Sequence, residues 1–403
     1  MGNEVGKSRL GGPQKSSIHY QGTRYITNKL INVEKQPEKV LLLGAKLPTH
    51  GSGWSLKDSI EELEELAISA GAQVMGKITQ RLRKRSNTYV GKGKICEIKS
   101  AIHDSGIDTV ICDDELSPNQ QLSLEAALGN VKVIDRTTLI LDIFASNAHS
   151  REGKLQISLA QQEYLLPRLA GQWTHLERLG GGIGTRGPGE SQIETDRRLS
   201  RTRIRKLKQD IDKVRQNRFR YRERRQASNV KTVALVGYTN AGKSTLLNTL
   251  TASKVLTENR MFSTLDPVTR KLILPSGGNV LITDTVGFVQ RLPTNLVAAF
   301  RATLEELNDA DLILHVLDVT HDRRLEQAES VEAILCEMGL SAKPTLVLMN
   351  KIDKLPDIAP RYDTSLNEFM DRFALSVFCS GTTGVGKNEI LGKIDHSVFP
   401  QSF

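Results

Sequence analysis

The stretch Gly237–Thr245 reads GYTNAGKST and decides the fold of the C-terminal part of the chain. An aliphatic run, Thr232–Val236, precedes it, and Leu246–Leu250 continues it with helical character. Gly-x4-Gly-Lys-Ser between a strand and a helix is typical of a phosphate-binding loop, whose backbone N–H groups surround phosphates at the positive end of the helix. We assign this role to the whole stretch: Gly237, Tyr238, Thr239, Asn240, Ala241, Gly242, Lys243, Ser244 and Thr245.

Two further segments supply polar groups for a nucleotide and Mg²⁺. Lys243 is expected to neutralise the β- and γ-phosphates and Ser244 to ligate Mg²⁺. The strand Val280–Thr283 leads into a DxxG motif, Asp284, Thr285, Val286 and Gly287. There Asp284 would hold Mg²⁺ through water, and the Gly287 N–H would reach the γ-phosphate.

Thr264 is the candidate for the switch I residue. It lies in residues 261–270, between the phosphate loop and the DxxG motif. In that role its hydroxyl and carbonyl would ligate Mg²⁺ only when the γ-phosphate is present. The alternative is an ordinary loop threonine.

An NKxD motif is expected to recognise the base of the nucleotide. The aliphatic run Thr345–Met349 is followed by Asn350, Lys351, Ile352 and Asp353, at a strand end, where doubly wound sheets place their ligands. The Asp353 carboxylate can accept the N1–H and N2–H donors of guanine, a pair that adenine lacks. GTP is therefore the expected substrate, with Mg²⁺ as cofactor.

Two positions depart from common GTPase patterns. Phe288 follows the DxxG motif where Ras-like enzymes have a glutamine that orients the attacking water. We therefore name no catalytic base and expect slow turnover that a partner stimulates. Ser380 and Gly381 occupy the place of an SAx motif, where the Gly381 N–H could still face guanine.

The N-terminal part is predicted to be α/β. Residues 1–37 are expected to be a flexible tail and 38–148 a small domain of alternating strands and helices. The predicted strands are Lys39–Leu43 and Asp108–Cys112, and the predicted helices are Leu56–Ser69, Ser117–Leu128 and Thr137–Ala145.

Residues 149–228 change to helix without strands. Leu155, Leu159, Gln162, Leu166 and Leu169 share one helical face, and Ile204, Leu207, Ile211 and Val214 follow a three-four spacing. Two such helices are expected to pair as an antiparallel hairpin. The connection Gly180–Glu190 is rich in glycine and suits a tip that a ligand orders, although a plain linker is the alternative.

The second helix of this hairpin is strongly basic, in a chain of net charge +9 and pI about 9.3. Lys and Arg that displace counterions from phosphates favour nucleic acid, whereas a solvated helix face is the alternative. The candidate RNA contacts are Gly184, Thr185, Arg186, Gly187, Arg197, Arg198, Arg201, Arg205 and Lys208. No long apolar run predicts a spanning helix.

These motifs in this order resemble the HflX family of GTPases. The resemblance rests on GGGIGTRGPGE, ETDRR, GYTNAGKST, STLDPVTR, DTVGF and NKID, and it extends from about Leu56 to Ser380. It implies a cytoplasmic GTPase that binds the large ribosomal subunit and splits stalled or idle ribosomes when GTP is bound. The family's N-terminal domain has been associated with ATP, but no phosphate loop precedes Arg151, so that role stays unassigned.

The expected fold class is α/β: an N-terminal α/β domain, a long antiparallel helical hairpin and a Ras-like P-loop G domain over residues 229–403 with a mostly parallel sheet. The chain ends soon after this domain, so an appended C-terminal domain is expected to be missing or vestigial. A monomer is expected. Two alternatives stay open: an RNA-binding module switched by nucleotide, and a regulatory GTPase whose basic helix touches a protein or a membrane surface.

Overall fold

The aliphatic runs of the N-terminal part form a four-stranded parallel sheet, ordered β2-β1-β3-β4. Its strands are β1 (Lys39–Lys46), β2 (Gln73–Arg81), β3 (Thr109–Cys112) and β4 (Lys132–Asp135). Its helices are α1 (Leu56–Ser69), α2 (Lys92–Ser105), α3 (Pro118–Ala127) and α4 (Arg136–Asn147). The computed structural model describes residues 37–47, 54–129, 131–172, 188–227, 230–252, 261–262, 264–291, 307–355, 364–373 and 376–400.

The prediction of this part was right in class and incomplete in detail. Helix α1 has the predicted bounds, and a capping box between Ser55 and Asp58 fixes its start. β2, α2 and β4 were not predicted, because their apolar signal is weak: only Ile78 is buried in β2, and only Ile95 and Ile98 in α2. β4 has just four residues.

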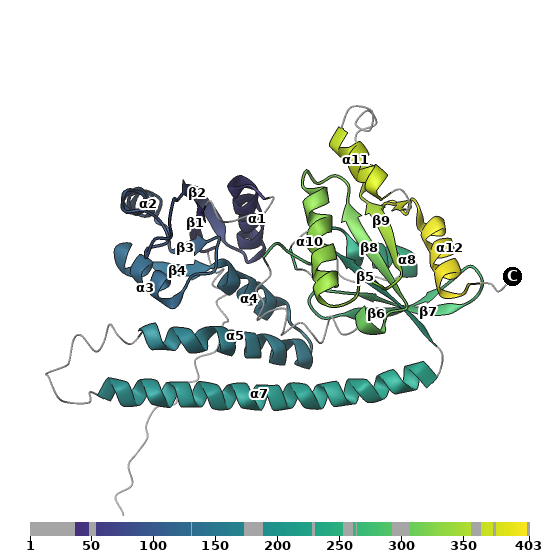
Figure 1. The fold of residues 1–403 in the computed structure, drawn as a ribbon, viewed down its shortest axis with the longest axis horizontal. Coiled ribbons are helices and arrows are strands. Elements are labelled where there is room, and N and C mark those ends of the chain that lie inside the picture. Colours follow the sequence, from purple (N-terminus) through teal and green to yellow (C-terminus); the bar gives the residue numbers. More distant parts are fainter. Residues whose placement is uncertain are drawn as a thin grey trace, which may run out of the picture. The chain divides into compact units, whose positions relative to one another are not determined.

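Helices α5 (Arg151–Gln172) and α7 (Pro188–Ala227) lie side by side as the predicted hairpin (Figure 1). On α7, Ile204 and Ile211 are buried and Leu207 and Val214 half-buried, as their spacing predicted. On α5, a face other than the predicted one is buried. Its residues Ile157, Ala160 and Tyr164 belong to a core that also includes residues of α1 and α4.

The C-terminal part holds a six-stranded sheet, ordered β10-β9-β8-β5-β7-β6, in which only β6 is antiparallel to its neighbour. The strands are β5 (Lys231–Gly237), β6 (Val268–Ile273), β7 (Asn279–Asp284), β8 (Leu312–Asp318), β9 (Thr345–Asn350) and β10 (Val377–Phe378). The helices are α8 (Lys243–Thr251), α10 (Arg324–Glu337), α11 (Thr364–Arg372), α12 (Lys387–Val398) and the 3₁₀ turn η1 (Ile352–Lys354). This mostly parallel α/β architecture confirms the expected fold class.

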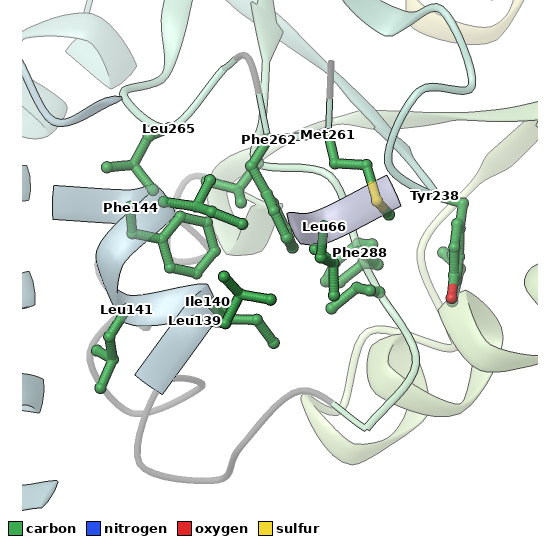
Figure 2. Packing of buried hydrophobic residues seen from close by; sticks show 14 of the residues in the cluster. Leu66, Leu139, Ile140, Leu141, Phe144, Tyr238, Met261, Phe262, Leu265 and Phe288 are labelled. Carbon is green, nitrogen blue, oxygen red and sulfur yellow. The ribbon is translucent and has the colours of Figure 1, made fainter. Parts of the chain in front are cut away.

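Pro37–Phe403 form one compact unit, and one apolar core crosses it. The core joins Leu66 of α1 and Phe144 of α4 to Phe262 and Phe288 (Figure 2). Both phenylalanines adjoin the phosphate loop. The nucleotide motifs are thus packed directly against the N-terminal sheet's helices. None of the described helices combines the length and apolarity needed to cross a bilayer.

Candidate nucleotide-binding site

The loop between β5 and α8 has a backbone that demands glycine at both ends. A Cβ at Gly237 would lie 2.3 Å from the Val316 carbonyl oxygen, and one at Gly242, where φ is +92°, would lie 2.3 Å from Asn350 Nδ2. Asn240 also has a positive φ, +60°. The motif's glycines therefore permit close approach of neighbouring strands as well as the turn itself.

Two hollows adjoin this loop, and their charge distinguishes them. The smaller, about 50 Å³, is lined by the start of α8 together with Thr264 and Gly287. The larger, about 500 Å³, adjoins Tyr238–Asn240 and carries Asp58, Glu61, Glu62 and Glu65. Carboxylates repel phosphates, whereas a helix N-terminus attracts them, so the smaller hollow is the better phosphate site although it is smaller.

Lys243 is a buried ammonium within the smaller hollow. Its Nζ donates to the carbonyls of Gly237 (3.1 Å) and Tyr238 (2.9 Å), which lie in the loop itself. The pKa of Lys243 is lowered to about 8, chiefly by burial; the nearby Asp284 opposes this shift and Lys351 adds to it. The site therefore holds a poorly solvated cation that a phosphate would stabilise.

Three oxygen groups meet at the first turn of α8. Ser244 Oγ donates to Asp284 Oδ2 (2.6 Å) and lies 2.8 Å from Thr264 Oγ1. Burial raises the pKa of Asp284, and its Oδ1 is buried with no hydrogen-bond partner among the described residues. Hydroxyl and carboxylate oxygens are the ligands that Mg²⁺ prefers, so this group fits a magnesium ion with its waters.

Gly287 lies against the phosphate loop, whereas the Phe288 side chain points into the apolar core. A Cβ at Gly287 would lie 2.8 Å from Thr239 Cα and 3.1 Å from Lys243 Nζ, so the DxxG glycine lies against the phosphate loop. Phe288 exchanges backbone hydrogen bonds with Gly237 and Thr239, and its ring is only 2% exposed. That ring lies in the apolar core (Figure 2) and presents no polar group to the site.

The three polar residues of the NKxD motif differ in burial and in their partners. Asn350 is buried and joins two loops, since its Nδ2 donates to the Ala241 carbonyl (2.8 Å) and its Oδ1 accepts from the Gly381 N–H (2.9 Å). Lys351 Nζ pairs with Asp318 Oδ2 at 2.7 Å. Asp353 is exposed in η1. Of these side chains, Asp353 is the carboxylate that a base could reach from solvent.

The loop Ser380–Gly381 packs closely on α8. A Cβ at Gly381 would lie 3.2 Å from the Leu246 backbone nitrogen, so the alanine of an SAx motif would be tight here. The Gly381 N–H, which we expected to face guanine, donates to Asn350 instead. Ser380 Oγ accepts from the Thr383 N–H at 3.0 Å and so shapes the turn.

Several residues of the predicted motifs are structural in this arrangement. The Thr285 hydroxyl donates to the Leu235 carbonyl (2.6 Å), and the Val286 side chain is buried. The Tyr238 hydroxyl donates to Glu62 and accepts from the Gln290 N–H (2.7 Å), so this side chain faces α1. Thr245 lines the smaller hollow.

Sequence reasoning missed the partners of this tyrosine. Glu62 and Asp113 both pair with the buried Arg136, the latter at 2.8 Å. Arg291, just after the DxxG segment, reaches Asp114 at 2.8 Å. The helical spacing of apolar residues predicted α1 itself, but no local pattern marks a glutamate whose partner is far along the chain.

The candidate RNA contacts lie on α7 or outside the described residues. Gly184, Thr185, Arg186 and Gly187 are outside them. Arg198, Arg201, Arg205 and Lys208 are exposed and Arg197 is half-buried. Lys208 pairs with Glu163 of α5 at 2.8 Å, whereas the described helix shows no ion pair for Arg201 or Arg205.

Three family models match the chain in succession. They are described as GTP-binding GTPase N-terminal (residues 57–145), GTP-binding GTPase middle region (147–225) and 50S ribosome-binding GTPase (232–351). Together they cover the N-terminal sheet, the hairpin and the site described above.

Curated relatives match over most of the chain. The GTPase HflX of Alkalihalophilus pseudofirmus is 51% identical over 326 residues, 81% of this chain and 76% of the relative. The GTPase HflX of Escherichia coli K12 is 46% identical over 330 residues, 82% of this chain and 76% of the relative. Among solved structures, the crystal structure of SsGBP in complex with GDP is 25% identical with a TM-score of 0.50, covering 91% of this chain and all of that one.

Proposed function

The chain belongs to the HflX family of GTPases, and from this premise we propose that it binds GTP in the hollow at the start of α8 and hydrolyses it to GDP and phosphate. The observation that supports this most is the meeting of Lys243, Ser244 and Gly287 around one hollow. Asp284 accepts a hydrogen bond from Ser244 there, and Asp353 is exposed in η1, just after β9. The phosphates would replace the loop carbonyls as partners of Lys243. Asp353 would accept from guanine.

Ser244 and Thr264 would hold Mg²⁺ directly and Asp284 through water. When bound, Mg²⁺ supplies positive charge that offsets the charge of the β- and γ-phosphate oxygens. The orphaned Asp284 Oδ1 supports this assignment, because a buried carboxylate oxygen without a partner is costly. The two proposed hydroxyl ligands, Ser244 Oγ and Thr264 Oγ1, lie 2.8 Å apart, close enough to contact the same ion.

Turnover without a partner is proposed to be slow. The buried Phe288 ring cannot orient an attacking water, since it offers no donor or acceptor. The backbone N–H groups of the loop and Lys243 would still stabilise charge on the leaving phosphate. Full activity would then need a group, or an ordering of the loops, that a bound partner provides.

The proposed partner is the large ribosomal subunit and its RNA, met by a cytoplasmic monomer, with ribosome splitting as the outcome in the GTP state. At 100° per residue, Arg197, Arg198, Arg201, Arg205 and Lys208 fall in an arc of about 100° beside the α5 seam. A basic strip of this kind suits an RNA backbone. The description of the family model over residues 232–351 as a 50S ribosome-binding GTPase supports the same partner.

The test measures phosphate release from GTP by the full chain with and without purified large subunits, and with Lys243→Ala as the blank. Strong stimulation by the subunits supports the proposal. Tight GTP binding with no stimulation would assign the switch to a different partner. Loss of 70S particles on sucrose gradients, with a non-hydrolysable GTP analogue but not with GDP, tests splitting separately.

A further inference from the structure

The described part of the proposed switch I segment, residues 261–262 and 264–270, contacts the start of the helical hairpin as well as the nucleotide site. Thr264 lies 2.8 Å from Ser244 on α8. Two residues later, Asp266 lies at the N-terminus of α5. One short stretch of backbone thus joins the phosphate loop to the hairpin's first helix.

Asp266 completes the N-terminal cap of α5. Its Oδ2 accepts from the backbone N–H groups of His149 (2.9 Å) and Ser150 (2.6 Å), and its Oδ1 accepts from the Ser150 hydroxyl. Ser150 Oγ in turn accepts from the Gly153 N–H (2.9 Å). A carboxylate at this place satisfies N–H groups that the helix cannot and interacts favourably with its dipole.

An apolar contact supports the polar one. The Phe262 ring meets Phe144 of α4 edge-on, with centroids 4.5 Å apart, and its carbonyl accepts from Asn147 Nδ2 (2.8 Å). Leu265, between Thr264 and Asp266, is 2% exposed and lies beside the Phe144 ring (Figure 2). The switch segment therefore contacts α4 and the start of α5, where the two helices join.

We propose that Asp266 is a positioning residue that couples the nucleotide state to the helical hairpin by capping α5 only while the switch segment is held at the site. With GTP, Thr264 is held beside Ser244 and the cap is intact. With GDP, Thr264 is released and Asp266 leaves the first turn of α5. α7 packs along α5, so the basic strip is held firmly only in the GTP state. This inference rests on the proposed GTP function.

The test is hydrogen–deuterium exchange of the full chain, without ribosomes, read on peptides spanning residues 149–157. In the wild type, these amides should exchange roughly tenfold faster with GDP than with a non-hydrolysable GTP analogue, because a lost cap opens the first turn. Asp266→Ala should exchange at the fast rate in both states. Its affinity for GDP should stay within about threefold of wild type, since Asp266 does not touch the nucleotide hollow. Because coupling is reciprocal, its affinity for the GTP analogue should fall by up to about tenfold but should not be lost.

A second variant displaces the same carboxylate without removing it. A Cβ at Gly153 would lie 2.5 Å from Asp266 Oδ1, so Gly153→Ala should also abolish the nucleotide difference, while alanine favours the helix itself. The matched control is Asp395→Ala, because Asp395 likewise accepts from a serine N–H (2.8 Å) and hydroxyl (2.7 Å), those of Ser276. It should keep the wild-type difference.

Nucleotide affinity measured on the same samples separates the two ideas. No binding of GTP or GDP would overturn the proposed function. Normal binding with equal exchange in both states of the wild type would overturn the coupling, and so would a nucleotide difference that persists in Asp266→Ala.

Discussion

At the residue scale, Lys243 gives the site a pH dependence. Its pKa of about 8 lies below the ordinary value because burial disfavours the ammonium. Between this value and the unfolded pKa of 10.5, the unfolded chain binds more protons, so the penalty of the buried charge is full below pH 8 and is relieved above it. The free energy of unfolding therefore rises with pH above pH 8 through this group. Phosphate binding needs the charged ammonium, so nucleotide affinity should change in the opposite direction.

We therefore expect GTP affinity to be constant near pH 7 and to fall above pH 8, approaching about tenfold per pH unit. A fluorescent, non-hydrolysable GTP analogue titrated between about pH 7 and pH 8.8 measures this, below the range in which guanine itself loses its N1 proton. Lys243→Ala should bind far more weakly and with no such slope. An equal slope in this variant would assign the titration to another group.

The exposed Asp353 carboxylate is the proposed contact to the guanine base. Asp353→Asn replaces an acceptor by an amide that also donates, so we expect the affinity for GTP to fall by roughly 10- to 100-fold, as for a lost charged hydrogen bond. XTP, with a C2 carbonyl in place of the amino group, should gain affinity. Competition titrations of GTP and XTP test this, with the exposed Asp371→Asn as control.

At the element scale, helix α7 has a basic strip and an opposite face of similar charge. Reversing Arg201, Arg205 and Lys208 to glutamate should weaken binding to large subunits by at least about tenfold and reduce the salt slope by roughly one unit for each lost phosphate contact. Binding is measured by co-sedimentation between about 50 and 200 mM salt. GTP affinity should not change, since none of the three lines the nucleotide hollow.

The matched control reverses Arg203, Lys206 and Lys213, which are exposed on the side of α7 away from the strip. The change in net charge is the same. If both triple variants lose binding equally, the attraction belongs to total charge and not to a defined strip. If neither loses it, the hairpin is not the contact.

Local patterns predicted the elements that carry the site, and distance along the chain explains what they missed. The phosphate loop, the DxxG and NKxD motifs and the α7 seam each lie within a few residues, so spacing alone finds them. Tyr238 and Glu62 are 176 residues apart, and Ser150 and Asp266 are 116 apart. Such pairs depend on how elements pack, which no periodicity in one segment encodes.

At the scale of the whole molecule, a buried polar network joins the N-terminal sheet to the phosphate loop. Arg136, at the start of α4, pairs with Asp113 after β3 and with Glu62 of α1, and Glu62 accepts from the Tyr238 hydroxyl. These two carboxylates raise the pKa of Arg136 against its desolvation, so it stays charged. Each charged group in this network is stabilised by its partner, because an unpaired buried charge is costly.

Arg136→Met should therefore destabilise the protein by about 3–5 kcal/mol, since it removes the cation that pairs with Glu62 and the nearer of the two that pair with Asp113, whose other partner, Arg291, lies 3.6 Å away. Arg372 offers a matched control. It also pairs with two carboxylates, those of Glu329 and Glu332, each at 2.8 Å, but it is 40% exposed, so Arg372→Met should cost no more than about 1 kcal/mol.

Urea unfolding of both variants measures the difference. Equal losses for the two arginines would mean that the network between the sheet and the phosphate loop is solvated in solution. In that case the N-terminal sheet would not hold the phosphate loop through Tyr238.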